Sequence, residues 1–332
     1  MIRGKRILPG LHRFIDRLYR RRRKQTPWME EALNGIIIID KEPDFTSADV
    51  VAKMRGICGQ KKIGHTGTLD PAATGVLPIC LGSGTKLCGL LTDKDKEYVA
   101  ELLLGVRTDT QDITGHVLEE APVEVTEDAV RDACLSFVGD YQQVPPMYSA
   151  LKVNGKRLYE LAREGKEVER KARPVTILAL EILEIRLPVV KMRVACTKGT
   201  YIRTLCADIG EKLGCGGSMQ SLRRTRVGRF TLEQAVTLGQ LQERKDSGRL
   251  AEALLPVESC FQGYPRLTVR AGADGLLENG NAIYPGQTVE NRIYGNQEWV
   301  CFHRPDGSFA GIYAFDETEK RYKPVKMFLG KE

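Results

Sequence analysis

The sequence predicts an α+β fold with a second, smaller β-rich domain at its C-terminal end. Segments with strand-like and helix-like patterns follow one another without the regular βαβ alternation of a doubly wound sheet. The length of 332 residues exceeds the usual size of one domain. From about residue 263, short apolar runs alternate with Gly, Asn, Asp and Pro turns, which is typical of a small β-rich domain.

Five segments of the larger domain have clear local patterns. Residues 35–40 (GIIIID) form a β-branched run that predicts a buried strand, and residues 46–59 have a Thr or Ser cap followed by helical apolar spacing. The stretches 96–106 and 191–205 are predicted as strands. Residues 126–139 begin with a capping-box pattern and are predicted as a helix.

Two segments are rich in basic residues. Residues 141–173 form a long excursion with Pro-Pro and Asn-Gly turns, in which aromatic and basic residues alternate as in a polynucleotide groove. A solvated helix-turn surface is the alternative. The stretch 221–230 (SLRRTRVGRF) places four arginines within seven residues and contains no acid. Such crowding indicates phosphate contacts, although a helix end with solvated arginines would also fit.

Composition excludes several classes of protein. The chain has 42% hydrophobic and 28% charged residues, as ordinary globular proteins do. No apolar run approaches the roughly 20 residues of a membrane-spanning helix, and no signal-type apolar segment follows the basic N-terminus. Nine scattered cysteines, never spaced as C-x-x-C, argue against a disulfide framework and a zinc site. We therefore expect a soluble, cytoplasmic protein without a bound metal.

The positive charge is concentrated at the start of the chain. Residues 1–27 contain ten Lys or Arg and one acid, a net charge of +9, so the remaining residues carry −2 out of the total of +7. This leader suits a polyanionic partner, but a solvated tail without a specific role is an equal alternative. An alternative start at Met29 would remove it.

One turn of small residues contains a single acid. In GHTGTLDPAATG, residues 64–75, Asp70 stands without a second acid, lysine or cysteine beside it. The chain has no Walker phosphate loop, no Gly-x-Ser-x-Gly elbow and no histidines in metal-ligand spacing. Asp70 is therefore a candidate nucleophile or base that needs an arginine counter-ion to stay ionised. The alternative is a turn aspartate that bonds its own backbone.

Several blocks of the sequence together resemble one family, the bacterial tRNA pseudouridine-55 synthases of the TruB family. The blocks are GHTGTLDPAATGVLPICLGSGTK, KEYVAELLLGVRTDTQDITG, VPPMYSALKVNGKRLYELAR, CTKGTYIRTLCADIG and LRRTRVGRF. They occur in the order of the family and span residues 33–262, which the resemblance defines as a catalytic domain with an RNA-clamping insertion at 141–173. Residues 263–332 resemble a PUA-type RNA-binding domain, and residues 1–32 form a basic extension without a recognised counterpart.

The resemblance implies a mixed, largely antiparallel sheet with flanking helices. It also implies that a uridine in the TΨC loop of tRNA, at position 55, is isomerised to pseudouridine after the base is flipped out of its stack. No cofactor is needed for this reaction. The expected partner is the TΨC stem-loop of tRNA, and the family pattern implies a monomer without an obligatory protein partner.

The resemblance also assigns residues to the site. Asp70 corresponds to the catalytic aspartate, Tyr98 to the active-site tyrosine and Arg203 to the arginine that pairs with the aspartate. His65 resembles the residue that occupies space around the flipped nucleotides, and Leu222 the apolar pocket wall. Further substrate or RNA contacts are expected at Lys41, Thr68, Tyr201, Arg223, Arg224, Lys152 and Arg157.

The chain departs from the family pattern at one motif. Where the family has Asp-Lys-Pro-x-Gly-x-Thr-Ser, this chain has Glu42 and Asp44 in place of the Pro and the Gly. The two added acids would weaken a phosphate grip by Lys41. Two other interpretations stay open from the sequence: an RNA chaperone without catalysis, and a synthase that acts on another RNA or as a subunit of a guide-RNA particle.

Overall fold

A mixed, largely antiparallel sheet forms the centre of the larger domain in the computed structural model, which describes residues 32–329. Its strands within this range are β1 (Gly35–Lys41), β2 (Ile63–His65), β3 (Thr74–Leu81), β4 (Lys96–Leu104), β7 (Gly139–Gln143), β10 (Arg173–Arg186), β11 (Val189–Cys196), β12 (Gly217–Val227) and β13 (Phe230–Thr231). The strand order is β1-β3-β12-β4-β11-β10-β7, with β2 beside β3 and β13 beside β12. The β3–β12 pair is parallel and the other described pairs of this sheet are antiparallel. The predicted fold class is confirmed.

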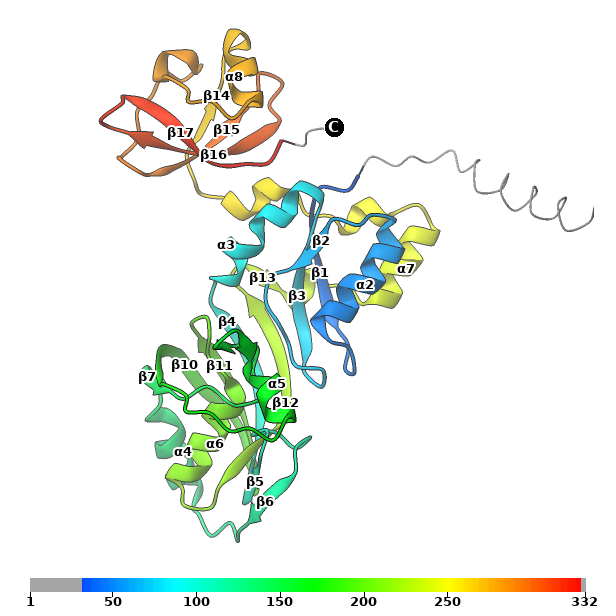
Figure 1. The fold of residues 1–332 in the computed structure, drawn as a ribbon, viewed down its shortest axis with the longest axis vertical. Helices are drawn as coiled ribbons and strands as arrows, with labels where there is room; N and C mark the ends of the chain where they lie inside the picture. Colours follow the sequence, from blue (N-terminus) through cyan, green and yellow to red (C-terminus); the bar gives the residue numbers. More distant parts are fainter. Residues whose placement is uncertain (1–31, 330–332) are drawn as a thin grey trace, which may run out of the picture. The chain divides into compact units, whose positions relative to one another are not determined.

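Helices cover the sheet in two groups. The helices of the described residues are α2 (Ser47–Cys58), α3 (Cys88–Thr92), α4 (Glu127–Leu135), α5 (Leu158–Arg163), α6 (Ile202–Lys212) and α7 (Leu238–Asp246), together with α8 (Asp274–Glu278), which belongs to the C-terminal region. Figure 1 shows α2 and α7 side by side next to β1, whereas α4 and α6 lie next to each other and against the other half of the sheet. A buried apolar cluster joins α4 and α6 to β4 and β11. No helix within residues 32–329 is long and apolar enough to cross a membrane.

The first strand and helix follow directly from their residues. The isoleucines at 36–39 in β1 are 0–1% exposed, because both faces of this strand are covered and β-branched side chains fit a pleated, buried surface. Helix α2 begins after Thr46, whose hydroxyl accepts a hydrogen bond from the Asp49 N–H while the Asp49 carboxylate accepts one from the Thr46 N–H. Both predictions are confirmed.

Three sequence predictions set their boundaries too far along the chain. The predicted strand 96–106 ends at Leu104. The predicted strand 191–205 ends at Cys196, a turn that contains Gly199 with a φ of 83° follows, and α6 begins at Ile202. The predicted helix 126–139 ends at Leu135. Its capping box is half present, since Thr126 accepts from the Ala129 N–H but alanine has no carboxylate to return the bond.

The C-terminal region is β-rich, as expected. Its four-stranded sheet has the order β14 (Arg266–Thr268), β15 (Trp299–His303), β16 (Phe309–Asp316), β17 (Arg321–Met327). A separate apolar cluster, which includes Phe302 and Tyr313, fills one side of this sheet. Two short hairpins complete the described strands: β5 (Val106–Thr108) with β6 (Val117–Glu120), and β8 (Lys152–Val153) with β9 (Lys156–Arg157). The predicted basic extension lies outside the described residues apart from Ala32.

Glycines hold α6 close to the start of β12. A Cβ added at Gly210 would lie 2.3 Å from the carbonyl carbon of Gly216 and from the nitrogen of Gly217. The Gly216 N–H also donates to the Gly210 carbonyl, 3.0 Å away. This contact fixes the helix against the sheet and so places Arg203, which lies in the first turn of α6.

We expect Gly210→Ala to lower the free energy of unfolding by about 1–3 kcal/mol through this clash. Helix propensity alone would change the free energy of unfolding in the opposite direction, since it favours Ala over Gly by up to about 1 kcal/mol. The matched control is Gly56→Ala in α2, where nothing lies within 4 Å of the added Cβ, and it should be neutral or stabilising. Urea unfolding of both variants checks the prediction, and equal effects at the two positions would contradict it.

Candidate active site

Asp70 lies in a tight loop between β2 and β3. The loop is fixed before the aspartate, because the Leu69 N–H donates to the buried hydroxyl of Ser47 at 3.0 Å. It is fixed after the aspartate as well, because the Ala73 N–H donates to the Asp70 carbonyl at 3.1 Å. The Asp70 carboxylate does not bond its own turn and instead reaches an arginine of α6. The alternative of a purely structural turn aspartate is therefore not favoured.

Lys41 bonds the same loop at the residue after Asp70. The residue is 1% exposed, and its ammonium group donates to the carbonyls of Glu42 and Pro71, each at 2.9 Å. The Asp44 N–H donates to the same Pro71 carbonyl at 3.0 Å. Burial lowers the pKa of Lys41 to about 8, although the nearby Asp70 raises it. Lys41 thus holds the residue that follows Asp70.

The two departures from the family motif fit this arrangement. Asp44 has a φ of 66°, in the left-handed region that favours glycine and that Asp tolerates better than most residues. Glu42 is exposed and offers its main-chain carbonyl, rather than its carboxylate, to Lys41. In this geometry Lys41 bonds main-chain carbonyls of the loop, and the added acids leave these bonds intact.

Arg203 pairs with Asp70 at the centre of the site. Its Nε lies 3.0 Å from Asp70 Oδ2, and its side chain is 5% exposed. One terminal nitrogen donates to the Thr110 carbonyl at 2.9 Å and lies 3.6 Å from Asp112 Oδ2. The other donates to the Tyr148 carbonyl at 2.8 Å. The guanidinium is therefore locked in one orientation with its Nε edge toward Asp70.

The charge of Asp70 results from opposing effects. Its side chain is 41% exposed by surface area, yet protein atoms surround the carboxylate closely enough that burial raises its pKa. Arg203 lowers the pKa, while the second carboxylate, Asp112, raises it. The net shift is upward from the ordinary value of an aspartate. A carboxylate in this environment is a stronger base than one in water.

Tyr98 and Arg224 form the buried wall beside this pair. They are register partners on β4 and β12, and they are 8% and 1% exposed. Arg224 Nε donates to the Val76 carbonyl at 2.7 Å, and NH1 lies 3.5 Å from the Thr68 carbonyl. Burial raises the pKa of Tyr98, and the adjacent Arg224 lowers it. Gly75 permits this packing, since a Cβ there would lie 2.2 Å from the Arg224 carbonyl oxygen.

The arginines in and just after β12 have ion-pair or hydrogen-bond partners on other segments of the chain. Arg223 NH2 lies 2.8 Å from Asp40 Oδ2, and Arg226 NH2 lies 3.8 Å from Glu97 Oε2. Arg229 bonds the Ser259 carbonyl and the Gln262 side chain. The alternative of a helix end is wrong, because residues 217–227 form a strand. Phosphate contacts by Arg223 and Arg224 stay a prediction; the burial of Arg224 restricts any such contact to a group that enters the site itself.

Four further predicted residues lie around the same loop and helix. The His65 Nδ1 lies 3.1 Å from the Gly67 carbonyl, and burial lowers the pKa of this ring. Thr68 is exposed on the Asp70 loop. Leu222 packs against the apolar cluster that contains Tyr98, and Tyr201 is the residue before α6. Their contacts with RNA stay predictions.

The two predicted basic contacts of the insertion lie on one hairpin. Lys152 and Arg157 are exposed register partners on β8 and β9. Arg157 NH1 donates to the Tyr159 hydroxyl at 2.9 Å, and the Arg163 guanidinium lies 5.4 Å from the centre of the Tyr159 ring. Aromatic and basic side chains are thus interleaved on this surface, as the sequence pattern indicated.

Sequence reasoning missed the groups that hold Arg203 in place. Asp112 and the carbonyls of Thr110 and Tyr148 surround its guanidinium, and Gln143 bonds the main chain of Tyr201. A main-chain carbonyl leaves no trace in the sequence. Asp112 lies in the RTDTQDITG part of the sequence, but no local pattern there indicates its contact with Arg203.

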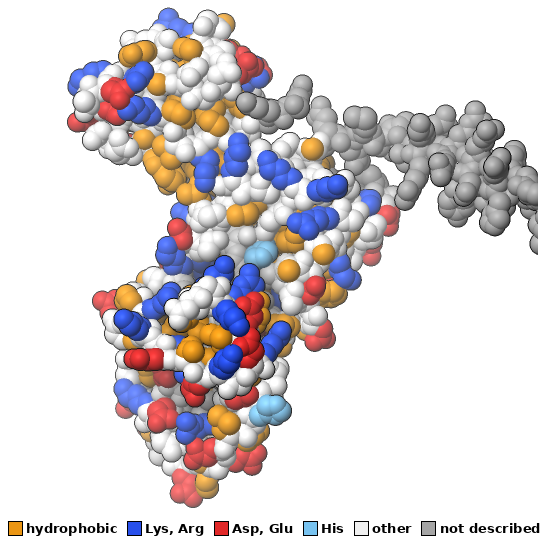
Figure 2. All heavy atoms as spheres, viewed as in Figure 1, with side chains coloured by type: hydrophobic (Ala, Val, Ile, Leu, Met, Phe, Trp, Pro, Cys, Tyr) orange, Lys and Arg blue, Asp and Glu red, His pale blue; other side chains and the backbone are white. Residues whose placement is uncertain are grey.

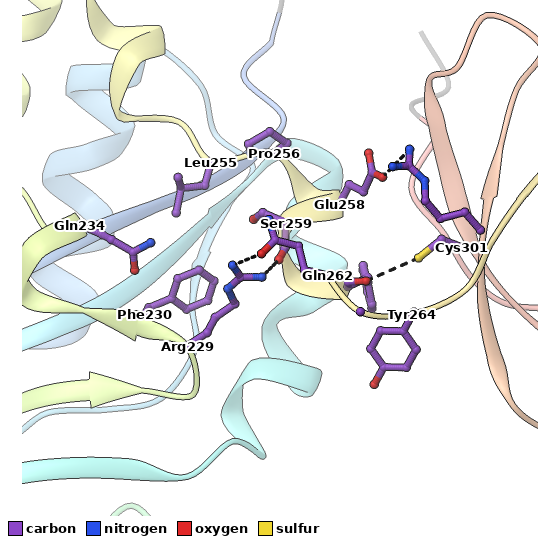
Figure 3. A pocket seen from close by; sticks show the side chains of 13 residues that line it. Arg229, Phe230, Gln234, Leu255, Pro256, Glu258, Ser259, Gln262, Tyr264 and Cys301 are labelled. Atoms are coloured by element: carbon purple, nitrogen blue, oxygen red, sulfur yellow. Dashed lines mark hydrogen bonds and ion pairs between the residues drawn. The ribbon is translucent and has the colours of Figure 1, made fainter.

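The remaining described chain offers weaker sites. A cavity of about 550 Å³ is lined by residues that include Arg229, Tyr264 and Cys301 (Figure 3). Its carboxylate, Glu258, is already paired with Arg266 at 3.0 Å, and none of the predicted catalytic residues lines the cavity. Across residues 32–329, no group of three or more His, Cys, Asp or Glu side chains is arranged to hold a metal ion.

Comparison with known proteins places the chain in a family. A model of the N-terminal domain of TruB family pseudouridylate synthases matches residues 55–202, and a model of the tRNA pseudouridylate synthase B C-terminal domain matches residues 203–262. A tRNA pseudouridine synthase B from Lachnoclostridium phytofermentans is 50% identical over 309 residues, covering 90% of this chain and 100% of that protein. One from Alkaliphilus oremlandii is 44% identical over 302 residues, with the same coverage of 90% and 100%.

Solved structures give the same result for the fold. A Cbf5-Nop10-Gar1 complex contains a chain that is 28% identical with a TM-score of 0.68, covering 90% of this chain and 86% of that chain. An H/ACA RNP bound to a substrate RNA containing 2′-deoxyuridine contains one that is 25% identical with a TM-score of 0.67 and equal coverage. The chain therefore belongs to the TruB family of tRNA pseudouridine synthases.

Proposed function

We propose that this enzyme isomerises the uridine at position 55, in the TΨC loop of tRNA, and that Asp70 is its catalytic carboxylate. The observation that carries the proposal is the Asp70–Arg203 pair, 3.0 Å apart and adjacent to the buried wall of Tyr98 and Arg224. The identity to tRNA pseudouridine synthase B proteins over their full length supports the choice of a tRNA substrate.

The reaction moves uracil from N1 to C5. The N1–C1′ bond breaks, a C5–C1′ bond forms, the C5 proton is lost and N1 gains a proton, so no redox or energy cofactor is required. Attack on C1′, attack on uracil C6 and removal of the 2′ proton all require Asp70 as a carboxylate. Arg203 favours the ionised form of Asp70 and orients its carboxylate, and the raised pKa of Asp70 makes that carboxylate a better base and nucleophile.

The uridine must leave its stack to reach Asp70. Extrusion of a base costs a few kcal/mol, which stacking and phosphate contacts offset. In this proposal Tyr98, which is buried beside Asp70, stacks on the base, and Leu222, which packs against the apolar cluster, helps to retain detached uracil until it rejoins. His65, kept neutral by burial, fills space beside the flipped nucleotides without adding charge.

Two outer surfaces are proposed to bind the rest of the RNA. The hairpin of Lys152 and Arg157 presents its basic face next to Tyr159, which suits backbone phosphates and an exposed base. Figure 2 shows Lys and Arg side chains gathered across the face that includes the regions of α2 and α5. The β-rich C-terminal region, residues 263–332, is proposed as an RNA-binding domain. We propose that the enzyme acts as a monomer without a protein partner or guide RNA.

Asp70→Asn is expected to reduce pseudouridine formation by at least about 10³-fold, because the amide can neither attack nor accept a proton. Tritium release from tRNA labelled at uracil C5 measures the turnover. The dissociation constant for tRNA should change little, since the side chain keeps its shape. Label release by the variant at the wild-type rate would refute the catalytic role of Asp70. If the wild type releases label and the variant binds tRNA without releasing it, the protein is not a pure RNA chaperone.

The single-turnover rate should fall about tenfold per pH unit below an apparent pKa that lies above about 4, the value of a free aspartate. The reason is the net upward shift of the Asp70 pKa by burial. The tRNA dissociation constant, measured over the same pH range, is the control for binding and folding. A rate that stays constant down to about pH 4 would contradict the prediction.

The same shift has a consequence for stability. Because the folded-state pKa of Asp70 is raised, the ionised form destabilises the fold above the pKa of a free aspartate, and this cost is absent at lower pH. Asp70→Asn should therefore raise the melting temperature at pH 7, and the gain should shrink as the pH falls toward about 4. A lower melting temperature of Asp70→Asn than of the wild type at pH 7 would contradict the prediction that burial outweighs ion pairing in setting the pKa of Asp70.

A bare TΨC stem-loop should be converted by the purified protein alone, with no guide RNA or second protein. The single chain contains Asp70, Tyr98, Arg203 and the basic hairpin, so each proposed element of catalysis is present. Mapping of pseudouridine in the product gives the position. Conversion only after addition of another protein or RNA would favour the guide-particle alternative.

A further inference from the structure

Gln143 joins the start of the insertion to the turn that precedes Arg203. It is the last residue of β7 and is 1% exposed. Its side-chain carbonyl accepts a hydrogen bond from the Tyr201 N–H at 2.7 Å, and its amide donates to the Tyr201 carbonyl at 3.0 Å. The buried amide therefore bonds both the N–H and the carbonyl of one residue.

Within the turn, the Thr200 hydroxyl donates to the Thr197 carbonyl at 3.0 Å, a bond that does not involve the Tyr201 backbone. Tyr201 is the N-cap residue of α6 but provides no side-chain cap bond. The preceding Gly199 has a φ of 83°, so the chain reverses sharply between β11 and α6. Without a capping side chain, the position of the first turn of α6 depends on what holds the Tyr201 backbone. Arg203 lies in that first turn, two residues after Tyr201.

The same part of the insertion also contacts the Arg203 side chain. The Tyr148 carbonyl accepts a bond from Arg203 NH2 at 2.8 Å. Gln143 is also the register partner of Arg173, so the two ends of the insertion meet in the sheet at this point. Residues 143–148 thus contact both the backbone and the side chain of the 201–203 turn.

We propose that Gln143 is a positioning residue for catalysis, which holds the Tyr201 backbone so that the Arg203 guanidinium faces Asp70. The inference rests on the proposed roles of Asp70 and Arg203. Gln143 does not touch substrate in this proposal and acts only through the turn. A displacement of a charged pair by about 1 Å is enough to cost about 10²-fold in rate.

The chain contains a matched control for general loosening of this helix. Tyr141, two residues earlier on β7, donates its hydroxyl to the Asp208 carboxylate farther along α6. Both Tyr141 and Gln143 therefore tie β7 to the α6 region, but only Gln143 reaches the residue before the first turn. Tyr141→Phe removes the bond to Asp208 and the contact of the Tyr141 hydroxyl with the Gln143 side chain, but it leaves both Gln143 groups that bond the Tyr201 backbone.

The test uses Gln143→Met, which keeps the length of the side chain and removes both hydrogen bonds. We expect the single-turnover rate on tRNA to fall about 10- to 100-fold, with the tRNA dissociation constant within about threefold of the wild type. The acid limb of the rate should move to higher pH, because Arg203 then lowers the Asp70 pKa less. Gln143→Glu, which keeps the acceptor for the Tyr201 N–H and lacks the donor, should also lose rate and serves as a second variant.

Tyr141→Phe should lower the melting temperature with little change in rate or in the acid limb. The proposal is overturned if Gln143→Met and Gln143→Glu keep the wild-type rate and pH profile, or if Tyr141→Phe changes both to the same extent as they do. Arg203→Gln and Asp70→Asn are measured alongside. Wild-type activity in Asp70→Asn would refute the proposed function and this inference together, whereas an inactive Asp70→Asn with a fully active Gln143→Met refutes the inference alone.

Discussion

The buried guanidinium of Arg203 is the constraint on which the rest of the site depends. An arginine does not give up its proton in a protein, so a guanidinium that is 5% exposed must find acceptors for its N–H groups. Here the acceptors come from the Asp70 loop, the turn at residues 110–112 and the insertion at Tyr148. Each of these segments has to reach α6 at the same point. The geometry of Asp70 therefore depends, through Arg203, on main-chain carbonyls of two other segments.

Two other buried cations of the site donate to main-chain carbonyls rather than to carboxylates. Lys41 donates to the carbonyls of Glu42 and Pro71, and Arg224 donates to that of Val76. A carbonyl dipole satisfies a donor without cancelling its charge, whereas a carboxylate would neutralise it. These cations therefore keep the region around Asp70 electropositive. This positive potential favours an ionised Asp70 and suits an anionic substrate. A chain with a negative net charge outside its first 27 residues can therefore still accept RNA at this site.

The sequence predicted the elements with strong local signals and the identity of the central pair. The strand at 36–39 and the helix cap at Thr46 depend on near neighbours in the chain, so the local sequence predicted them. The block motifs identified Asp70 and Arg203. The partners of Arg223 and Arg203 were not recoverable from local patterns, because Asp40 and the Thr110 carbonyl lie 183 and 93 residues away along the chain. The alternative of a helix end at 221–230 failed for the same reason, because the acids that pair with Arg223 and Arg226 lie on other strands, at Asp40 and Glu97.

Unpaired buried polar atoms occur in several parts of the described chain. Arg224 NH2 and Asp40 Oδ1 lie on strands beside the Asp70 loop, whereas others, such as Arg170 Nε and His303 Nδ1, lie elsewhere. Unpaired polar atoms therefore do not by themselves mark the site. What distinguishes the Asp70 region is a carboxylate whose pKa is raised by burial against the pull of an arginine, and carboxylates with shifted pKa values cluster at functional sites.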